Sequence, residues 1–233
     1  MNMRAIEMDP AAAKEILAVS CGAGIDSNRS RGFYGNGAKR VFDTCLILAA
    51  APVVLPFILL MAMIIACDGA NPFFAQKRVG QGGKVFRIWK LRTMVANAED
   101  ELAHYLAANP EARAEWERTQ KLKSDPRVTW IGRFLRKTSM DELPQLFNVL
   151  RGDMSLVGPR PMMVEQRSIY PGTEYYLLRP GLTGLWQISG RSNTTYMERV
   201  QMDRFYVMKW NPWMDLRIIF MTIPAVALSR GAH

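Results

Sequence analysis

One long apolar segment dominates the hydrophobic pattern of the chain. It runs from Val41 to Cys67 and contains a single formal charge, Asp43. Because a helix rises about 1.5 Å per residue, a run of roughly 25 apolar residues is long enough to cross the hydrocarbon core of a bilayer. The pattern therefore predicts a membrane-associated helix in this part of the chain.

Two features of this segment favour a helix that enters the bilayer and returns. Pro52 and Pro56 lie in its middle, where proline removes a backbone donor and bends a helix. Basic residues flank both ends, and because cytoplasmic flanks retain lysine and arginine, neither end is suited to the outer side. We expect residues 39–68 to form a re-entrant helix–break–helix with both termini of the chain in the cytoplasm; an ordinary kinked spanning helix is the alternative. The flanking residues are Arg29, Arg31, Lys39 and Arg40 before the segment, and Lys77, Arg78, Lys84 and Arg87 after it.

The polar and apolar positions after this segment predict short strands and then helices. Residues 73–79 and 85–91 are strand candidates, and the glycine-rich segment between them predicts a β-hairpin. Residues 97–123 have the pattern of two polar helices. Residues 218–223 are apolar but too few to span a bilayer, so they form either a core helix or, as we favour, part of an interfacial helix with Trp210 and Trp213 as anchors.

Composition narrows the class of protein. The chain has 233 residues, with 30 Lys and Arg against 21 Asp and Glu, which gives a formal net charge of +9. A hydrophobic fraction of 49% excludes a mainly disordered chain, and a mean hydropathy of −0.06 excludes several membrane spans. Three scattered cysteines and two histidines argue against a disulfide framework, a zinc site or Cys/His catalysis. The excess of basic residues favours an anionic partner, which is nucleic acid, a phosphate ligand or an acidic membrane surface.

The candidate chemistry lies in residues 132–161, where Asp141 and Glu142 stand among basic residues. One interpretation is a capping box, because Ser139-x-x-Glu142 is a pattern that caps the start of a helix. The surroundings favour phosphate chemistry instead, since a carboxylate can attack phosphorus or bind a metal while guanidinium groups hold phosphate oxygens in pairs. The basic residues are Arg133, Arg136, Lys137, Arg151 and Arg160.

A series of sequence blocks from residue 38 to residue 231 carries a family resemblance. The blocks read KRVFD at 39–43, FFAQKRVG at 73–80, KLRTM at 90–94, DELPQL at 141–146, GDMSLVGPRP at 152–161 and RPGLTGLWQISGR at 179–191. One block alone is weak evidence, but so many in order are specific. The chain resembles the bacterial sugar transferases, the monotopic phosphoglycosyl transferases that start the assembly of exopolysaccharides and glycoconjugates.

The resemblance implies a reaction and a set of site residues. Family members transfer a sugar-1-phosphate from a UDP-sugar to a polyprenyl phosphate, usually undecaprenyl phosphate, at the cytoplasmic face of the inner membrane, and they need Mg²⁺. By position, Asp141 matches the nucleophile that forms a covalent phosphosugar intermediate and is the expected metal ligand, and Glu142 matches its partner. The expected phosphate-binding residues are Arg160, Arg136, Lys90 and Arg92.

The late residues 222–231 look most like those of undecaprenyl-phosphate galactose phosphotransferases of exopolysaccharide synthesis. Galactose is therefore the expected sugar, with glucose and N-acetylated sugars as alternatives. The implied partners are the UDP-sugar, undecaprenyl phosphate, membrane lipid and downstream glycosyltransferases. Nucleic acid is not expected, because the basic residues are dispersed and no nucleic-acid motif is present. A non-catalytic membrane scaffold is the alternative from another class of protein.

The expected fold is α+β and mainly helical. A flexible leader (residues 1–38) precedes the re-entrant membrane helix (residues 39–68). A compact cytosolic or interfacial catalytic domain follows (residues 69–233), with a small β-hairpin, amphipathic helices and a C-terminal interfacial helix.

Overall fold

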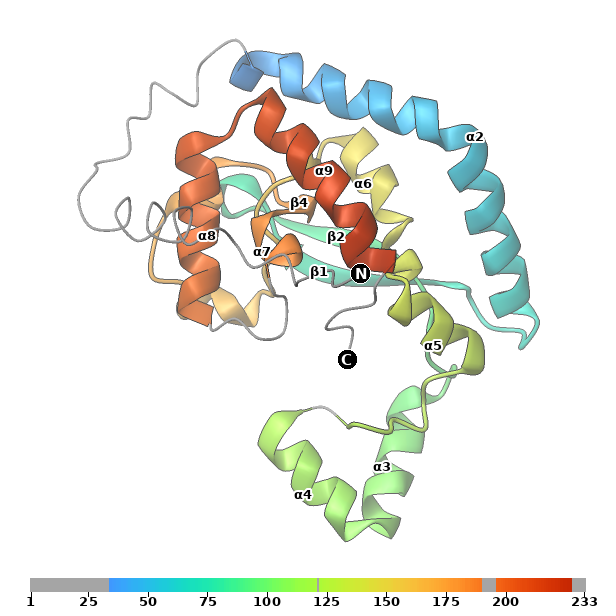
Figure 1. The fold of residues 1–233 in the computed structure, drawn as a ribbon. Coiled ribbons are helices and arrows are strands. Elements are labelled where there is room, and N and C mark those ends of the chain that lie inside the picture. The colour runs from blue at the N-terminus through green and yellow to red at the C-terminus, as the bar shows by residue number, and fades with distance from the viewer. Residues whose placement is uncertain (1–33, 121, 190–195, 228–233) are drawn as a thin grey trace, which may run out of the picture.

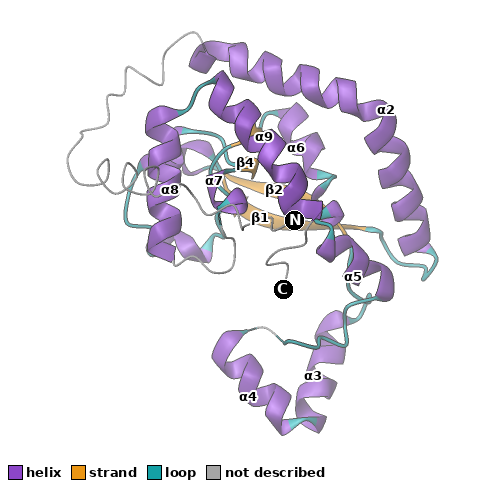
Figure 2. Ribbon diagram, in the orientation of Figure 1, coloured by secondary structure: helices purple, strands orange, loops and turns teal. Residues whose placement is uncertain are grey.

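The computed structural model describes residues 34–120, 122–189 and 196–227 (Figure 1). These residues are mainly helical and include two small two-stranded sheets (Figure 2), as the sequence predicts. Residues 1–33 of the predicted leader lie outside the described residues, and residues 34–38 form a π-helical turn before α2. The α-helices are α2 (Lys39–Ala66), α3 (Ala98–Ala108), α4 (Pro110–Thr119), α5 (Trp130–Lys137), α6 (Gln145–Arg151), α7 (Leu185–Ile188), α8 (Tyr196–Lys209) and α9 (Pro212–Ala227). The strands are β1 (Phe73–Val79), β2 (Val85–Leu91), β3 (Ser155–Val157) and β4 (Gly181–Thr183).

The apolar segment forms one helix, α2, which bends in its middle. Pro52 and Pro56 lie inside it, and each lacks the N–H that would bond to the carbonyl four residues earlier. Figure 1 shows the first half of α2 passing over one side of the molecule and the second half turning in a new direction. The expected break is therefore a bend within a continuous helix. By length and composition α2 is able to cross a membrane, and its middle is exposed, with Val53 77% accessible.

Both ends of α2 pack on the same folded body. At its start, Lys39 forms an ion pair with Asp215 of α9, and Asp43 accepts a 2.6 Å hydrogen bond from Ser155 of β3. At its end the contact is apolar, and burial of each large side chain there contributes about 1.5–3 kcal/mol. The buried residues of this contact are Met61, Ala62 and Ile65 of α2 with Leu91, Ile131 and Leu135.

The predicted β-hairpin is confirmed with the predicted bounds. β1 and β2 pair antiparallel, with Arg78 directly opposite Phe86. Opposed residues point to the same face of a sheet, and so do residues four apart along a strand, so Arg78 and Lys90 share a face. Gly82 and Gly83 in the turn have φ angles of 64° and 75°, a conformation that glycine adopts without strain.

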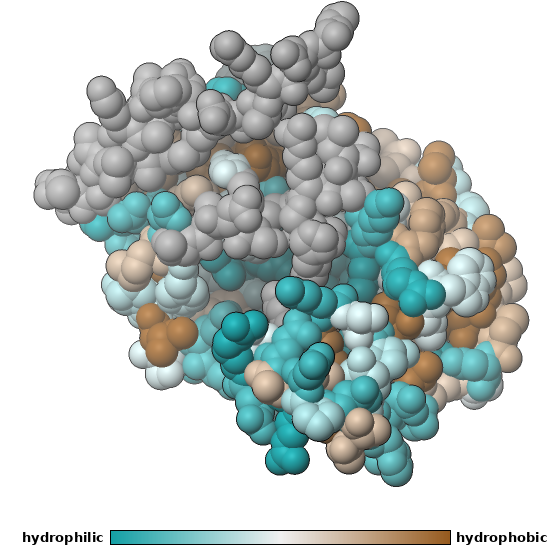
Figure 3. Space-filling view, turned by 60° about the horizontal axis from the view of Figure 1, so that its bottom comes forward, coloured by the Kyte–Doolittle hydropathy of each residue, from teal (hydrophilic) through white to brown (hydrophobic). Residues whose placement is uncertain are grey.

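The two predicted polar helices are confirmed as α3 and α4, which project from the rest of the molecule (Figure 1). No residue of either helix is buried. Figure 3 shows mostly hydrophilic side chains over this end of the molecule and hydrophobic side chains along the side where α2 lies. The pair is joined to the body through a bridge between Met94 and Val128 and by the Arg127 guanidinium over the Trp116 ring, at 5.3 Å.

The C-terminal helices cover the parallel pair β3 and β4. Tyr206 of α8 and Ile218 of α9 are buried against Val157 of β3. On its other side, α9 exposes Trp213 by 80% and Phe220 by 67%. The packed face agrees with the core-helix alternative, and the interfacial placement of the exposed face stays a prediction.

Candidate active site

The two predicted catalytic carboxylates lie on a short 3₁₀ turn, η4 (Met140–Glu142), between α5 and α6. Ser139 before it has a φ of 54°, a left-handed conformation that is unfavourable for serine. The capping-box interpretation is wrong, because among the described residues the Ser139 side chain makes no capping hydrogen bond, and α6 begins only at Gln145. Contacts from distant segments hold the acidic pair.

Lys90 of β2 joins the two carboxylates. Its Nζ lies 2.7 Å from Glu142 Oε1 and 3.5 Å from Asp141 Oδ2. The Asp141 side chain is 12% exposed and the Glu142 side chain 20% exposed. Ion pairs so far removed from water interact more strongly than those on a surface.

Arg160 approaches Glu142 from the loop after β3, with its Nη2 3.7 Å from Glu142 Oε1. Its guanidinium lies over the Trp186 ring at 5.2 Å, and the Arg199 guanidinium lies 5.0 Å from the centre of the same ring. Arg199 also donates a hydrogen bond to the Arg160 carbonyl, at 3.3 Å. Both the side chain and the backbone of Arg160 are thus held in place.

Arg136 of α5 acts on Asp141 through its charge. Its Nε donates a 2.9 Å hydrogen bond to Thr93 Oγ1, which fixes the guanidinium near the pair. Burial lowers the pKa of Arg136, and Asp141 is the first of the groups that oppose this.

Arg92 is directed elsewhere. Its guanidinium forms an ion pair with Asp68, just after α2, with a shortest distance of 2.6 Å. The structure therefore brings Lys90, Arg160 and Arg136 to the acidic pair and places Arg92 at the end of α2.

A narrow cleft beside Glu142 is lined by further residues that sequence reasoning missed. Arg78 and Gln187 fall inside the family blocks but were not singled out there. The signal for Arg78 was the alternation of β1, which places it on the face of the hairpin that carries Lys90. The polar and charged residues that line the cleft are Arg78, Lys90, Glu142, Gln145, Arg160 and Gln187.

The electrostatic surroundings separate the two carboxylates. Burial works to raise the pKa of Glu142, but Lys90, Arg160 and Arg78 outweigh it and hold that pKa below its usual value. Burial raises the pKa of Asp141, and Lys90 opposes this only in part. Glu142 is the more firmly ionised of the two.

The acidic pair fits Mg²⁺ in a mode with few protein ligands. Among residues 34–120, 122–189 and 196–227, no group of three or more His, Cys, Asp or Glu side chains is placed to hold a metal ion. Mg²⁺ is often bound by one or two carboxylates, with substrate phosphates and water as its other ligands. Asp141 and Glu142 match that donor set.

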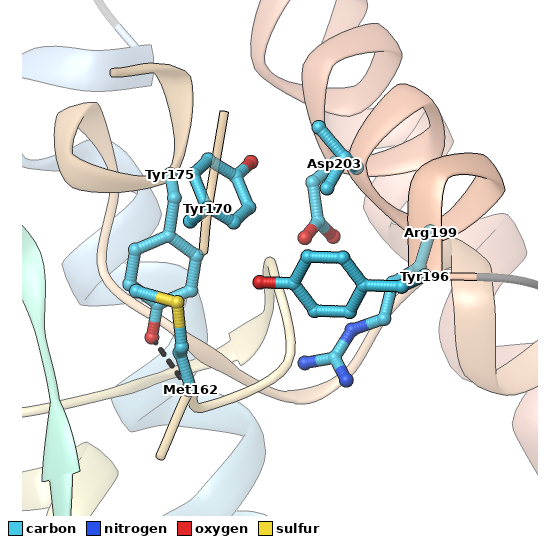
Figure 4. A pocket seen from close by; sticks show the side chains of 7 residues that line it. Met162, Tyr170, Tyr175, Tyr196, Arg199 and Asp203 are labelled. Carbon is cyan, nitrogen blue, oxygen red and sulfur yellow. Dashed lines mark hydrogen bonds between the residues drawn. The ribbon is translucent and has the colours of Figure 1, made fainter. Parts of the chain in front are cut away.

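A second buried polar cluster lies beside the Arg160 loop (Figure 4). We call it the tyrosine–aspartate cluster; its members are Tyr170, Tyr175, Tyr196 and Asp203. The Tyr175 hydroxyl accepts a 2.9 Å hydrogen bond from the Met162 N–H and donates one of 2.6 Å to the Val79 carbonyl. Burial raises the pKa of Asp203 to about 7, and Arg199 opposes this.

Known proteins are similar to this chain in sequence. A model of the bacterial sugar transferase family matches residues 34–229. The exopolysaccharide production protein ExoY of Rhizobium meliloti is 46% identical over 85% of this chain and 89% of its own length. The undecaprenyl-phosphate galactose phosphotransferase of Salmonella typhimurium is 46% identical over 84% of this chain, which spans 41% of that relative's length. The UDP-glucose:undecaprenyl-phosphate glucose-1-phosphate transferase of Caulobacter vibrioides is 40% identical over 84% of this chain and 72% of its own length.

The family match covers most of the chain and includes η4, the hairpin and the Arg160 loop. The resemblance seen in the sequence blocks is thereby confirmed. The chain belongs to the bacterial sugar transferase family.

Proposed function

We propose that this chain transfers a sugar-1-phosphate from a UDP-sugar to undecaprenyl phosphate and releases UMP, as the first membrane step of exopolysaccharide synthesis. The observation that carries the proposal is the acidic pair Asp141–Glu142, which Lys90 bridges, with Glu142 lining a cleft together with Lys90, Arg160 and Arg78. The names of the Salmonella and Caulobacter relatives support the reaction class, but they differ in the sugar. We propose galactose, with glucose or an N-acetylated sugar as the alternative.

Asp141 is the proposed nucleophile. One of its carboxylate oxygens attacks the phosphorus that carries the sugar, the bond from that phosphorus to the UMP oxygen breaks, and UMP leaves with the electron pair. A phosphate oxygen of undecaprenyl phosphate then attacks the same phosphorus, and breakage of its bond to Asp141 restores the carboxylate. Lys90 and Arg136 favour the ionised form that this attack needs.

Glu142 and the cations around it are proposed to bind and orient the phosphates. Glu142 holds Lys90 and Arg160 at the cleft through its charge. The planar guanidinium of Arg160 suits two phosphate oxygens at once, whereas Lys90 offers a point charge that screens the approach of an anionic phosphate to Asp141.

Mg²⁺ is the proposed cofactor. Asp141, with Glu142 beside it, would hold the ion together with phosphate oxygens of the donor and water. When bound, Mg²⁺ supplies positive charge to the phosphate oxygens and to the departing UMP. Because Lys90 already contacts both carboxylates, it would share their oxygens with the ion.

We propose that α2 enters the inner membrane from the cytoplasmic side and returns to it. Two contacts support this, because Lys39 at its start and Ile65 near its end both pack on the same folded body. A straight crossing would separate the two ends by about 30 Å of hydrocarbon. Cysteines introduced at Gly37 and Asn71 should both react with a membrane-impermeant reagent from the cytoplasmic side, and periplasmic labelling of either contradicts the proposal.

The C-terminal helix α9 is proposed to lie at the membrane surface. Its exposed face carries Trp213, Arg217 and Phe220, and tryptophan and arginine are typical of membrane interfaces. This placement would hold the cleft near the height of the lipid phosphate, which a lipid-linked acceptor requires.

The central experiment measures UMP release from UDP-galactose by the full chain in detergent with undecaprenyl phosphate and Mg²⁺. Asp141→Asn should reduce turnover by a factor of about 1,000 or more, because a neutral amide is too weak a nucleophile to form the acyl phosphate that the carboxylate forms. Asp100→Asn on the exposed helix α3 is the matched control and should retain activity. The unaltered chain mixed with donor alone should gain the mass of one hexose phosphate. The proposal fails if Asp141→Asn keeps its activity, or if no UDP-sugar supports UMP release.

A further inference from the structure

We infer that Arg78 is a further phosphate-binding residue of the cleft, and that it acts together with Arg160 on the diphosphate of a nucleotide sugar. The identity of the ligand rests on the proposed function. The assignment of Arg78 to an anion rests on its own contacts and charge.

Arg78 is the second-last residue of β1, and its side chain lines the cleft. It is only 8% exposed, and it lies on the hairpin face that also presents Lys90. Its neighbour Lys77 points to the other face and is exposed. One strand therefore places one cation in solvent and the next in the cleft.

The hydrogen bonds of Arg78 leave part of its guanidinium unused. Nη2 donates to Gln76 Oε1 at 2.7 Å, while the buried Nε has no hydrogen-bond partner among the described residues. Buried arginines that serve structure alone are normally paired and hydrogen-bonded, because an unsatisfied buried donor is costly. This donor belongs to a side chain that lines the cleft.

The charges of the cleft favour an anion of more than one charge. Three cations, Arg78, Lys90 and Arg160, line it with a single carboxylate, Glu142. Burial and the nearby Arg160 both lower the pKa of Arg78, and Glu142 opposes them. A diphosphate ester carries two negative charges at neutral pH and offers oxygens to several donors at once, so it matches two guanidinium groups and a lysine.

The backbone fixes the two arginines relative to each other. Val79, which follows Arg78, donates its N–H to the carbonyl of Met162, two residues after Arg160, at 2.9 Å. The hydroxyl of Tyr175 ties the same two segments together. Donors that are held in place before the ligand arrives lose less conformational entropy on binding. This arrangement suits two arginines that bind one diphosphate together.

The test compares UDP with uridine as ligands of the full chain in detergent, by competition binding. Arg78→Gln should weaken UDP by about 10- to 100-fold, because hydrogen bonds to a charged group are lost, and should leave uridine unchanged. Arg78→Lys should weaken UDP by less, since it keeps the charge but loses the planar fork. Lys77→Gln on the same strand removes the same charge outside the cleft and should change neither affinity.

Three outcomes overturn the inference. The first is no binding of UDP to the unaltered chain, and the second is an unchanged ratio of UDP to uridine affinity in Arg78→Gln. The third is an equal loss of both ligands with a lower melting temperature, which indicates a structural role. If Arg78→Gln does not fold, the ratio in Arg78→Lys decides. Because binding needs no turnover, the ratio reports on Arg78 even if the proposed reaction fails.

Discussion

Two carboxylates of this chain, the partly buried Glu142 and the buried Asp203, lie in opposite electrostatic surroundings. Glu142 has Lys90 at 2.7 Å and Arg160 at 3.7 Å, and together with Arg78 they hold its pKa below the usual value although burial acts to raise it. Asp203 has Arg199 as its opposing cation, and burial raises its pKa to about 7. The number of cations within reach, more than burial itself, decides whether a buried acid is ionised near neutral pH.

This difference separates two tasks. The firmly ionised Glu142 lines the cleft and pairs with Lys90 and Arg160, which are cations of the kind that the proposed phosphate ligands need. Asp203 belongs to the tyrosine–aspartate cluster beside the Arg160 loop, and burial there raises its pKa. The proposed phosphate binding thus lies at the cleft, while the cluster packs beside the loop that carries Arg160.

The largest effect is expected from Lys90→Met, which removes the cation closest to both site carboxylates. UMP release should fall to background, and the free energy of unfolding at pH 8 should fall by about 3–5 kcal/mol, because buried charge loses its partner. The folded pKa of Glu142 lies below its ordinary value of 4.5, so its stabilising effect is present above pH 4.5 and is lost as pH falls through the folded pKa. That acid-side loss should shrink in Lys90→Met.

Urea unfolding at pH 8 and below pH 4.5 measures both effects. Lys84→Met in the exposed hairpin turn is the matched control and should change neither activity nor stability by more than about 0.5 kcal/mol. If Lys90→Met is as stable as this control and loses stability in acid to the same extent, Lys90 does not stabilise the ionised form of Glu142.

The next effect is expected from Asp203→Asn, which should make the protein more stable at pH 8. The folded pKa of about 7 lies above the ordinary value of 3.8, so the associated stability is fully present below pH 3.8 and is lost as pH rises through about 7. The difference between these values corresponds to at most about 4 kcal/mol. The variant should gain up to that amount at pH 8 and lose the slope between pH 4 and pH 7.

Urea titrations from pH 4 to pH 8 measure this slope. Asp100→Asn on the exposed face of α3 controls for the loss of one surface carboxylate. If Asp203→Asn is less stable than the unaltered chain at pH 8, the raised pKa of Asp203 is contradicted.

Much of the fold was predictable because its signals are local. Strand-like runs on either side of a glycine-rich segment predicted the hairpin and its bounds, and the polar pattern of residues 97–123 predicted α3 and α4. The prolines of α2 predicted its bend. The start of α6 was not predictable from Ser139. The capping pattern predicts that a helix starts directly after Ser139, but this residue has a left-handed backbone and is followed by the 3₁₀ turn η4, so α6 begins only at Gln145.

The candidate site was predictable in part. Lys90 and Arg160 were predicted as site residues from their positions in the family blocks, and both lie close to Glu142. Arg78 lies near the end of β1 and Arg92 directly after β2, and long-range contacts decide which of the two reaches the cleft. Asp68 after α2 engages Arg92, and pairing of the end of β1 with the Arg160 loop turns Arg78 into the cleft.

The smallest effect is expected from Tyr175→Phe, which removes the link between the cluster and the cleft. The hydroxyl accepts from the Met162 N–H and donates to the Val79 carbonyl, so its loss leaves two buried backbone groups with one partner fewer and should cost about 1–3 kcal/mol. Because Arg78 and Arg160 adjoin these two segments, the KM for the UDP-sugar should rise several-fold, with a smaller change in kcat. Steady-state UMP release and urea unfolding measure both.

Tyr176→Phe is the matched control, since that ring packs against Tyr175. Equal changes in the two variants would mean that only ring packing matters, whereas a KM effect confined to Tyr175→Phe would show that the cluster sets the position of the cleft arginines.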